Sequence, residues 1–324
     1  MGLACQYIEN LTDIPTLDGE KQVLLLNWPH LFYHCPMEQP RWLPSLRRWE
    51  GWRYRLWQLR RRGVNVVWLL HNVLPHSSGI ERMDIAIRRY LMRKCADVVV
   101  FCADSLTELE KITGRRLRHS AVVPYPPHRL PPWTAIDRNA ARINLDIKPE
   151  QRVFLNFGKW RNYKGLDELI AAFRQLEDED SRLVIMGEAT REVSEQRLQE
   201  ICRDDLRIRL IAGRYTDEQM AQWLAAADWV ALPYHRVTNS GTAMTALNYG
   251  CPVIAPRLGC LPVLIPDDAG MLYDAGGLLP TLKNAATMGE DELDRMRKAT
   301  QESYRESDIT HTAEAIKAAL EGFS

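Results

Sequence analysis

The chain has 324 residues, more than a single hydrophobic core usually accommodates, so we expect two domains. Its 42 basic and 42 acidic side chains cancel overall. Residues 1–140 nevertheless carry 20 Lys and Arg against 13 Asp and Glu, and residues 141–324 carry 22 against 29. The basic first half predicts an anionic partner, either a phospholipid surface or a nucleic acid. The acidic second half gives no sign of such a partner, so we expect only the first half to contact it.

Two further patterns narrow the class of protein. No apolar run approaches the roughly 20 residues of a membrane-spanning helix, and MGLACQYIENLTD lacks the basic start and apolar centre of a signal peptide. The seven cysteines show neither CxxC spacing nor histidines at zinc-ligand intervals. We therefore expect a cytoplasmic protein, at most peripheral on the inner face of the plasma membrane.

In the first half, short apolar runs alternate with amphipathic stretches. Runs that are continuous in apolar residues, as buried parallel strands are, lie at 21–29, 64–72, 97–103 and 119–125. Helices are expected at about 44–62, 79–95 and 105–113, the last opened by a capping box from Ser105 to Glu108. This repetition predicts a doubly wound, Rossmann-like α/β domain.

Residues 41–62 hold eight arginines and four tryptophans. Projected as a helix, the segment separates into an apolar arc of about 160° and a basic side, with Arg53 and Arg60 intruding on the apolar arc. Either the helix packs on its sheet with a solvated basic face, or it lies on anionic lipid; both hold if part of the arc packs and the rest is exposed. Nucleic acid would use the same residue types, but no recognised binding motif accompanies them, so we expect a membrane surface and no nucleic acid. The apolar arc consists of Leu46, Trp49, Trp52, Leu56, Trp57 and Leu59, and the basic side of Arg47, Arg48, Arg55, Arg61 and Arg62.

A proline-rich stretch, PYPPHRLPPW at 124–133, predicts a linker. We expect an N-terminal domain at 1–135, a second Rossmann-like domain at 136–305 facing it across a cleft, and a C-terminal helix at 306–324 that crosses back to the first domain. Ligands in such sheets bind outside the carboxyl ends of the strands. In the second domain, strands are expected at 152–158, 182–187, 207–213, 229–234 and 252–256, and helices at 166–176, 191–202, 217–227 and 242–249.

Two runs in the second half suit a diphosphate. In NFGKWRNYKGLDELIAAF (156–173), a strand ends at Gly158, and the basic residues Lys159, Arg161 and Lys164 precede a helix. Cations near a helix start can bind phosphate by charge-assisted hydrogen bonds, although a solvated surface loop would look the same. In LPYHRVTNSGTAMTALNYGCPVIAP (232–256), the polar residues Asn239, Ser240, Gly241 and Thr242 lie between a strand and a helix, which aims backbone N–H groups at an anion.

Together the two runs resemble the donor domain of a GT-B glycosyltransferase. With NWP after the first strand, LHNVLPH at 70–76 and RNYKG at 161–165, the chain is similar from about residue 21 to 275 to bacterial exopolysaccharide β-mannosyltransferases of the xanthan type. The resemblance implies the GT-B fold and transfer of mannose from GDP-mannose to a glycan on a lipid diphosphate, without a cofactor. It also places the nucleoside at Gly187, Arg214, Tyr215 and Thr245, although Arg214 and Tyr215 are equally explained as a surface pair.

The sequence departs from that family plan in two respects. Alignment on Gly250-Cys251-Pro252-Val253 puts Val237 and Thr245 where retaining members of the larger family carry two glutamates. In addition, the first strand, glycine turn and helix of the N-terminal domain have no counterpart, because 21–29 already matches a later strand. Because the two glutamates are missing, an inverting reaction is expected. The alternatives are a retaining transferase, or a non-catalytic subunit that keeps the nucleotide pocket.

An inverting transfer needs a general base on the acceptor side. His71 and His76 are the candidates because they flank a strand end in the first domain, and a histidine near its ordinary pKa of about 6.5 is adequate as a base. Glu81 and Asp104 are further candidates, and His71 is alternatively a hydrogen-bonding ligand for the sugar. Asp178-Glu179-Asp180 imitates a metal-binding DxD motif but precedes a strand, so we interpret it as a solvated turn and expect no metal, since cations can stabilise the leaving diphosphate.

Overall fold

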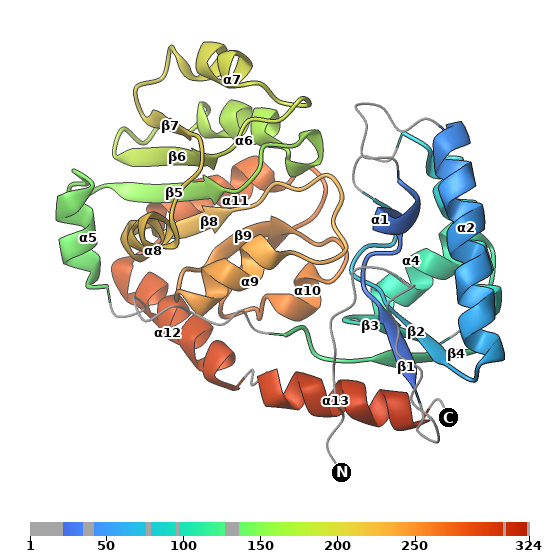
Figure 1. Cartoon of the computed structure of the whole chain (residues 1–324). Coiled ribbons are helices and arrows are strands. Elements are labelled where there is room, and N and C mark those ends of the chain that lie inside the picture. Colours follow the sequence, from blue (N-terminus) through green and yellow to red (C-terminus); the bar gives the residue numbers. More distant parts are fainter. Residues whose placement is uncertain are drawn as a thin grey trace. The chain divides into compact units, whose positions relative to one another are not determined.

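The computed structural model describes residues 22–34, 42–75, 79–94, 97–126, 136–306 and 309–322 (Figure 1). The chain folds into two compact units, and the C-terminal residues group with the first. The predicted domain boundary at residue 135 lies outside the described residues. Unit 1 comprises Met1–Pro124 with Ala313–Ser324, and unit 2 comprises Tyr125–Thr312.

Unit 1 is built on a parallel four-stranded sheet in the order β1-β2-β3-β4. Its central strands are buried on both faces, which explains why their sequences are continuous in Val and Leu. Because the strands are parallel, the segments that follow β1, β2 and β3 meet at one edge of the sheet. The strands are β1 (Val23–Leu26), β2 (Asn65–Leu69), β3 (Asp97–Val100) and β4 (His119–Val122); the helices are α1 (His30–Tyr33), α2 (Trp42–Arg61), α3 (Glu81–Lys94) and α4 (Ala103–Thr113).

Unit 2 holds a parallel six-stranded sheet in the order β10-β9-β8-β5-β6-β7. Counted from β7, this is the order 3-2-1-4-5-6 of a doubly wound nucleotide-binding fold, and the order reverses between β5 and β8. The strands are β5 (Arg152–Phe157), β6 (Ser181–Gly187), β7 (Ile208–Ala212), β8 (Trp229–Ala231), β9 (Val253–Pro256) and β10 (Gly270–Tyr273). The helices are α5 (Arg138–Asn144), the 3₁₀ turn η3 (Asn162–Lys164), α6 (Leu166–Phe173), α7 (Glu195–Cys202), α8 (Asp217–Ala226), α9 (Gly241–Asn248), α10 (Leu261–Leu264), α11 (Leu278–Thr287) and α12 (Glu290–Glu306), before α13 (Ile309–Gly322).

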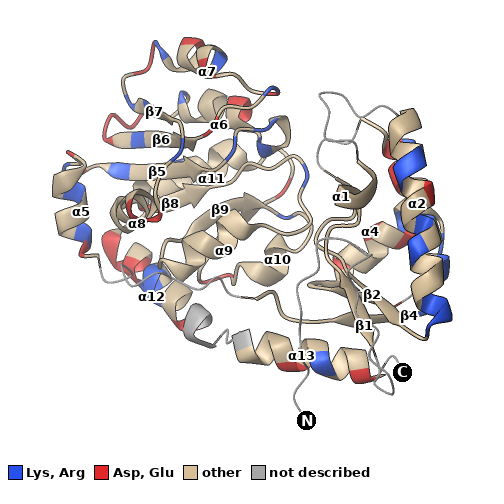
Figure 2. Cartoon of the chain, viewed as in Figure 1, with Lys and Arg blue, Asp and Glu red and all other residues tan. Residues whose placement is uncertain are grey.

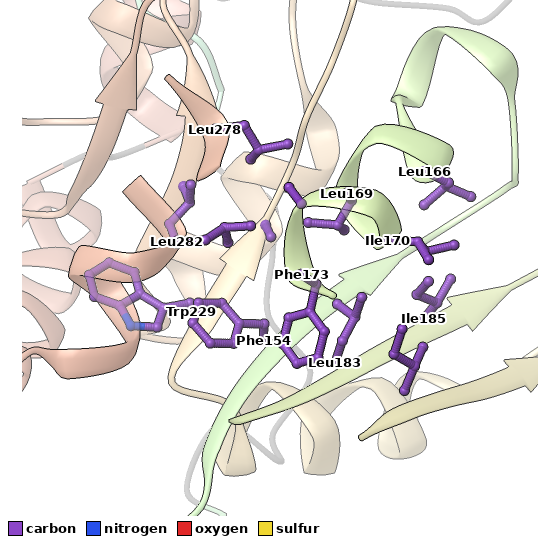
Figure 3. Close-up of a cluster of buried hydrophobic side chains, with 14 of the residues drawn as sticks. Phe154, Leu166, Leu169, Ile170, Phe173, Leu183, Ile185, Trp229, Leu278 and Leu282 are labelled. Carbon is purple, nitrogen blue, oxygen red and sulfur yellow. The ribbon is translucent and has the colours of Figure 1, made fainter. Parts of the chain in front are cut away.

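Helices cover both faces of this second sheet. On one face, Phe154 and Trp229 of the strands pack against Phe173 of α6 and Leu282 of α11 (Figure 3). On the other face, Val153 and Leu155 pack with side chains of α8 and α9. Successive β5 residues thus serve opposite cores, as the alternation of side chains along a strand requires.

Buried Asp228 fixes the amino end of β8 to its surroundings. The carboxylate is 1% exposed and accepts hydrogen bonds from the backbone N–H of Val153 (2.7 Å) and from four arginines. Because such a charge is costly to bury unless it is paired, the cluster holds β5, α5 and α12 against β8. The arginines are Arg138 (2.5 Å), Arg142 (3.5 Å), Arg152 (3.4 Å) and Arg297 (2.5 Å).

The expected capping box at the start of α4 is wrong. The helix begins at Ala103, its N-cap is Cys102 without a side-chain cap, and the backbone N–H of Ser105 donates to the Cys102 carbonyl within the first turn. Ser105 is buried, and its Oγ lies 3.3 Å from the Sγ of Cys102. The first turn instead follows directly from β3, with no intervening polar residue to serve as a cap.

The predicted helix at 44–62 corresponds to α2, whose apolar arc divides as one interpretation required. Trp49, Trp52, Leu56 and Leu59 are buried. Leu46 and Trp57 are exposed, together with three further large apolar side chains, Trp42, Leu43 and Tyr54. The described arginines of α2 are all exposed, and they appear as blue bands along the helix in Figure 2. None of the described helices has the length and apolar content needed to cross a membrane.

Candidate functional site

The two predicted phosphate runs meet where the strand order of unit 2 reverses. Residues 158–165, the β5 loop, follow β5, and residues 232–240, the β8 loop, follow β8; the two strands are neighbours with Leu155 paired to Val230. The backbone N–H of His235 donates to the carbonyl of Tyr163 (2.8 Å), so the loops are also bonded to each other. In open α/β sheets the carboxyl ends of such a strand pair form the ligand crevice.

Gly158, Lys164 and Thr242 come together at this point. A Cβ atom at Gly158 would lie 2.7 Å from the Nζ of Lys164 and 3.9 Å from the Oγ1 of Thr242. Lys164 is only 7% exposed, and its Nζ donates to the carbonyl of Phe157 (3.3 Å). A buried ammonium group beside a hydroxyl and the start of α9 can bind an oxyanion.

Gly165 lets the β5 loop approach the β8 loop. Its φ is +67°, and a Cβ there would lie 2.0 Å from the carbonyl oxygen of Pro233. No other residue fits this position, because both the left-handed backbone and the close contact require glycine. Gly187 at the end of β6 is constrained similarly, since a Cβ there would lie 1.9 Å from the Gly158 carbonyl oxygen.

Ser240 caps α9. Its Oγ accepts the backbone N–H of Ala243 (3.0 Å) and lies 3.1 Å from the buried hydroxyl of Tyr234. The cap leaves Gly241 and Thr242 as the first helical residues, where backbone N–H groups have no partner within a helix. Ser240 therefore orients the helix start, while its predicted contact with a diphosphate stays a prediction, as does that of partly buried Asn239.

The other two predicted cations are each paired with a glutamate, and their contact with a diphosphate stays a prediction. NH1 of Arg161 lies 2.8 Å from Oε1 of Glu192, and the Nζ of Lys159 lies 3.9 Å from Oε2 of Glu188. Glu188 also accepts from the Nε of exposed Arg214 (2.7 Å). The two glutamates follow β6 and form with their neighbours the β6 loop (residues 188–194), which the sequence reasoning did not include in the site.

The remaining predicted nucleoside residues lie near the ends of β6 and β7 and on α9. Tyr215 is partly buried against the core that includes α8, and burial raises the pKa of its hydroxyl. Gly213, which follows β7, bonds through its N–H to the carbonyl of Gly187 (2.8 Å), so the segments carrying Gly187 and Arg214 are adjacent. Thr245 is partly buried in α9.

A second unpredicted pair lies at the same strand ends. The Nε2 of His235 lies 3.0 Å from Oε2 of Glu168, and a Cβ at Gly165 would lie 3.1 Å from that nitrogen. The histidine lies in the β8 loop and directly follows the strand predicted at 229–234, which was the available signal in the sequence. Val237, two residues after His235, is 6% exposed and packed in the core. Its apolar side chain occupies the position at which retaining members of the larger family carry a glutamate, so no carboxylate is present there.

In unit 1, His71 follows β2 and stacks on the ring of Trp28, with centroids 4.6 Å apart and planes at 15°. Burial lowers the pKa of His71 to about 4, so the ring is neutral at pH 7. The other candidate histidine, His76, lies outside the described residues. Glu81 and Asp104 are exposed in the first turns of α3 and α4.

The Asp178-Glu179-Asp180 segment is a turn that leads into β6, as interpreted from the sequence. Asp178 accepts hydrogen bonds from the backbone N–H of Asp180 (2.9 Å) and the hydroxyl of Ser181 (2.6 Å), so its carboxylate holds the turn together. Within the described part of the chain, no three His, Cys, Asp or Glu side chains are grouped as metal ligands.

The chain is similar to known glycosyltransferases. Residues 151–286 match the family model described as Glycosyl transferases group 1. GDP-mannose:glycolipid 4-beta-D-mannosyltransferase of Xanthomonas campestris pv. campestris is 27% identical over 239 residues, which are 72% of this chain and 61% of that relative. The chain thus spans less than two thirds of this relative's length.

Two solved structures show the same fold. Sucrose-phosphate synthase from Thermosynechococcus elongatus matches with a TM-score of 0.67 at 19% identity, over 92% of this chain and 71% of that one. Anabaena HepE in complex with UDP-glucose matches with a TM-score of 0.65 at 19% identity, over 82% of this chain and 75% of that one.

Proposed function

We propose that this chain, which has the GT-B fold and carries a glycosyltransferase group 1 domain at residues 151–286, transfers a sugar from a nucleotide-diphosphate sugar to a lipid-linked acceptor. The observation that carries the proposal is the meeting of Lys164, Gly158 and Thr242 at the β5–β8 switch point. A buried cation there favours an anionic ligand, and the adjoining helix start favours it further.

The proposed chemistry is displacement at the anomeric carbon. The acceptor hydroxyl oxygen forms a bond to that carbon, the bond from carbon to the phosphate oxygen breaks, and the nucleoside diphosphate leaves with the bonding electron pair. Lys164 and the N–H groups that begin α9 stabilise the negative charge that develops on the leaving group, so no metal ion is required. A base in unit 1, with His71 as the described candidate, takes the hydroxyl proton.

The expected stereochemical outcome is inversion. Val237 is a packed core residue at the position of a family glutamate, so no carboxylate extends from there toward the transferred sugar. Measurement of the product's anomeric configuration by NMR tests this point, and retention with a single transferred sugar would support the retaining alternative.

The Xanthomonas relative supports a finer assignment. Its name specifies GDP-mannose as donor and a glycolipid as acceptor. We carry both to this chain: the sugar is mannose, the nucleotide is GDP, and the acceptor is a lipid-diphosphate-linked oligosaccharide in exopolysaccharide or cell-surface glycan synthesis. The enzyme is then cytoplasmic and peripheral on the inner leaflet, where α2, with exposed arginines, tryptophans and leucines, contacts anionic lipid.

The experiment is a binding titration of GDP, UDP and dTDP, each alone and as a sugar conjugate, by calorimetry. Lys164→Gln is expected to weaken binding of the preferred nucleotide at least about tenfold, since a charge-assisted bond contributes roughly 1.5–3 kcal/mol. Lys283→Gln, which neutralises an exposed lysine in α11, is the matched control. Unchanged affinity in Lys164→Gln for every nucleotide would refute the proposed site.

A non-catalytic partner subunit is the second candidate, and the absence of a carboxylate at Val237 favours it. Saturable binding of a nucleotide sugar without hydrolysis or transfer, across a broad panel of lipid-linked acceptors, would support this candidate. Transfer to any acceptor would reject it.

A further inference from the structure

Three aromatic rings form a layered stack at the carboxyl ends of the unit 1 strands. Trp28 follows β1, His71 follows β2, and Phe101 follows β3. The Trp28 and His71 rings are nearly parallel at 4.6 Å, and the His71 and Phe101 rings are tilted by 49° at 5.3 Å. Phe101 is 3% exposed and Trp28 is 38% exposed, so the stack runs from the core to the surface.

One buried polar cluster holds the segments that carry Trp28 and His71. The hydroxyl of Tyr33 in α1 donates to Asp84 of α3 (2.5 Å), and NH1 of Arg88 donates to the Tyr33 oxygen (3.1 Å). The Nε of Arg88 also donates to the carbonyl of Val73, two residues after His71. Asp84, Arg88 and Tyr33 are all buried, so the segments after β1 and β2 are fixed relative to each other.

This anchoring makes the surface of Trp28 a rigid platform. The ring of His30 meets Trp28 edge-on at 5.8 Å and lies 5.4 Å from the ring of His34. His34 is oriented in turn by Asp84, 3.1 Å from its Nε2. An exposed indole beside imidazole rings combines an apolar face with nitrogen atoms that can hydrogen-bond, the usual make-up of a small-molecule site.

We propose that Trp28, backed by His71, is the stacking platform for a pyranose ring of the acceptor other than the one that carries the reacting hydroxyl, because the indole separates this ring from His71. The C–H bonds on one face of a pyranose are apolar and slightly positive, and they complement the negative face of an indole. The sugar hydroxyls lie around the ring edge, where His30 can reach them. This inference rests on the proposed function, because an acceptor glycan is what brings a sugar ring to unit 1.

The arrangement selects a sugar over a nucleobase. A nucleobase would be expected with its diphosphate, and the predicted phosphate and nucleoside residues all belong to unit 2. The platform therefore suits a neutral ring with one apolar face.

Saturation-transfer NMR on the full chain tests the proposal, with cellobiose, lactose, maltose and β-1,4-mannobiose as probes. At least one is expected to receive saturation on the ring protons of a single face. Trp28→Ala is expected to lose about 90% of that signal and Trp28→Phe to keep most of it, because a smaller aromatic ring still stacks. Val122→Ala, which trims an exposed apolar side chain on β4, is the control.

His71→Ala and His71→Phe separate the backing role from chemistry, since only the second keeps an aromatic ring under Trp28. We expect the first to weaken the signal and the second to preserve it. Equal signals in the wild type and Trp28→Ala, or no signal from any probe, would overturn the proposal. Nucleotide titrations of the wild type and the same variants test the proposed function separately. If the wild type binds no nucleotide, that function is refuted, regardless of the NMR signal of the disaccharides.

Discussion

The guanidinium NH1 of Arg161 lies 2.8 Å from Oε1 of Glu192, whose Oε2 accepts the backbone N–H of Asn162 at 3.1 Å. The β6 loop thus holds a carboxylate against a cation that the sequence assigns to the diphosphate. If Arg161 turns to a ligand, it must give up this partner. The ion pair then opposes nucleotide binding, by an amount typical of partly exposed pairs.

Glu192→Gln is therefore expected to strengthen binding of the preferred nucleoside diphosphate by about threefold, because it removes the competing charge and keeps an acceptor for Asn162. Calorimetric titration at low salt measures the change. Glu50→Gln, which breaks the exposed Arg53 pair in unit 1, should leave the affinity unaltered. Weaker binding by Glu192→Gln would show that the carboxylate positions the loop and does not compete.

Gly158→Ala is expected to lower nucleotide affinity at least about tenfold and to destabilise the fold by roughly 1 kcal/mol. The added methyl group would lie 2.7 Å from the Nζ of Lys164, which must then move, and the φ of +111° adds strain. Gly63→Ala is the matched control, since its φ is +82° and its Cβ would meet nothing within 4 Å. Both variants should unfold at a lower temperature than the wild type, because both backbones are strained. If both variants lost nucleotide affinity equally, the steric explanation would be ruled out.

Which parts of the site could be predicted from the sequence depends on whether their contacts require knowledge of the strand order. The β5 and β8 loops were predicted because each follows a continuous apolar strand, and parallel strands bring the residues after them to one edge. The sequence could not show that these two strands are neighbours, because the order β8-β5-β6 emerges only when helices cover both faces of the sheet.

Contacts that depend on this order were missed. The partners of Lys159 and Arg161, Glu188 and Glu192, are about 30 residues away in the sequence, in the loop that follows β6, the neighbour of β5. β10 was missed because it is an edge strand of only four residues, Gly270–Tyr273, too short to show a pattern in the sequence. The stacking of Trp28 on His71 was equally invisible, since both rings lie in irregular segments after their strands.

The chemistry of His71 gives a pH prediction. Because burial lowers its pKa to about 4, His71 stays in the neutral, proton-accepting form through the neutral range. Transferase activity limited by this base should be nearly constant from pH 7.5 to 5.5, and should not halve near 6.5, the ordinary histidine value. A kcat/KM profile on the wild type measures this.

His71→Phe is expected to lower kcat at least about 100-fold while the acceptor KM stays within about twofold, since the ring is kept and the base is lost. A variant with full kcat would assign proton transfer elsewhere, with Glu81 and Asp104 as the next described candidates to substitute.

The same shift predicts how stability depends on pH. The folded pKa of His71 is lower than the unfolded value of 6.5, so the unfolded chain takes up the proton first as the pH falls. The free energy of unfolding should therefore decrease between pH 6.5 and 4, by about 2 kcal/mol at pH 5 from this group. Urea unfolding at pH 7.5 and 5.0 should show a smaller loss in His71→Phe than in the wild type. Equal losses would mean that the ring is not kept neutral by burial.

Along α2, exposed cations alternate with exposed apolar rings. The guanidinium of Arg61 lies 5.0 Å over the ring of Trp57, which stacks in turn on Tyr54. Near an anionic surface each such arginine contributes roughly 1 kcal/mol, and apolar rings add area buried among the lipids. Replacement of Arg53, Arg60 and Arg61 by Gln should therefore weaken binding to phosphatidylglycerol vesicles about 100-fold, with little change on phosphatidylcholine.

Vesicle flotation measures this binding. The matched control replaces three exposed cations of unit 2, Arg174, Arg203 and Lys283, by Gln, so the net charge changes equally while α2 is intact. Trp42→Ala with Trp57→Ala should reduce the binding that survives in high salt, because salt screens the arginines and leaves the apolar contact. If the control triple variant lost as much as the α2 triple variant, overall charge would explain the attraction and the helix would have no special part in it. Equal recovery of the wild type on both lipids would remove the electrostatic contribution altogether.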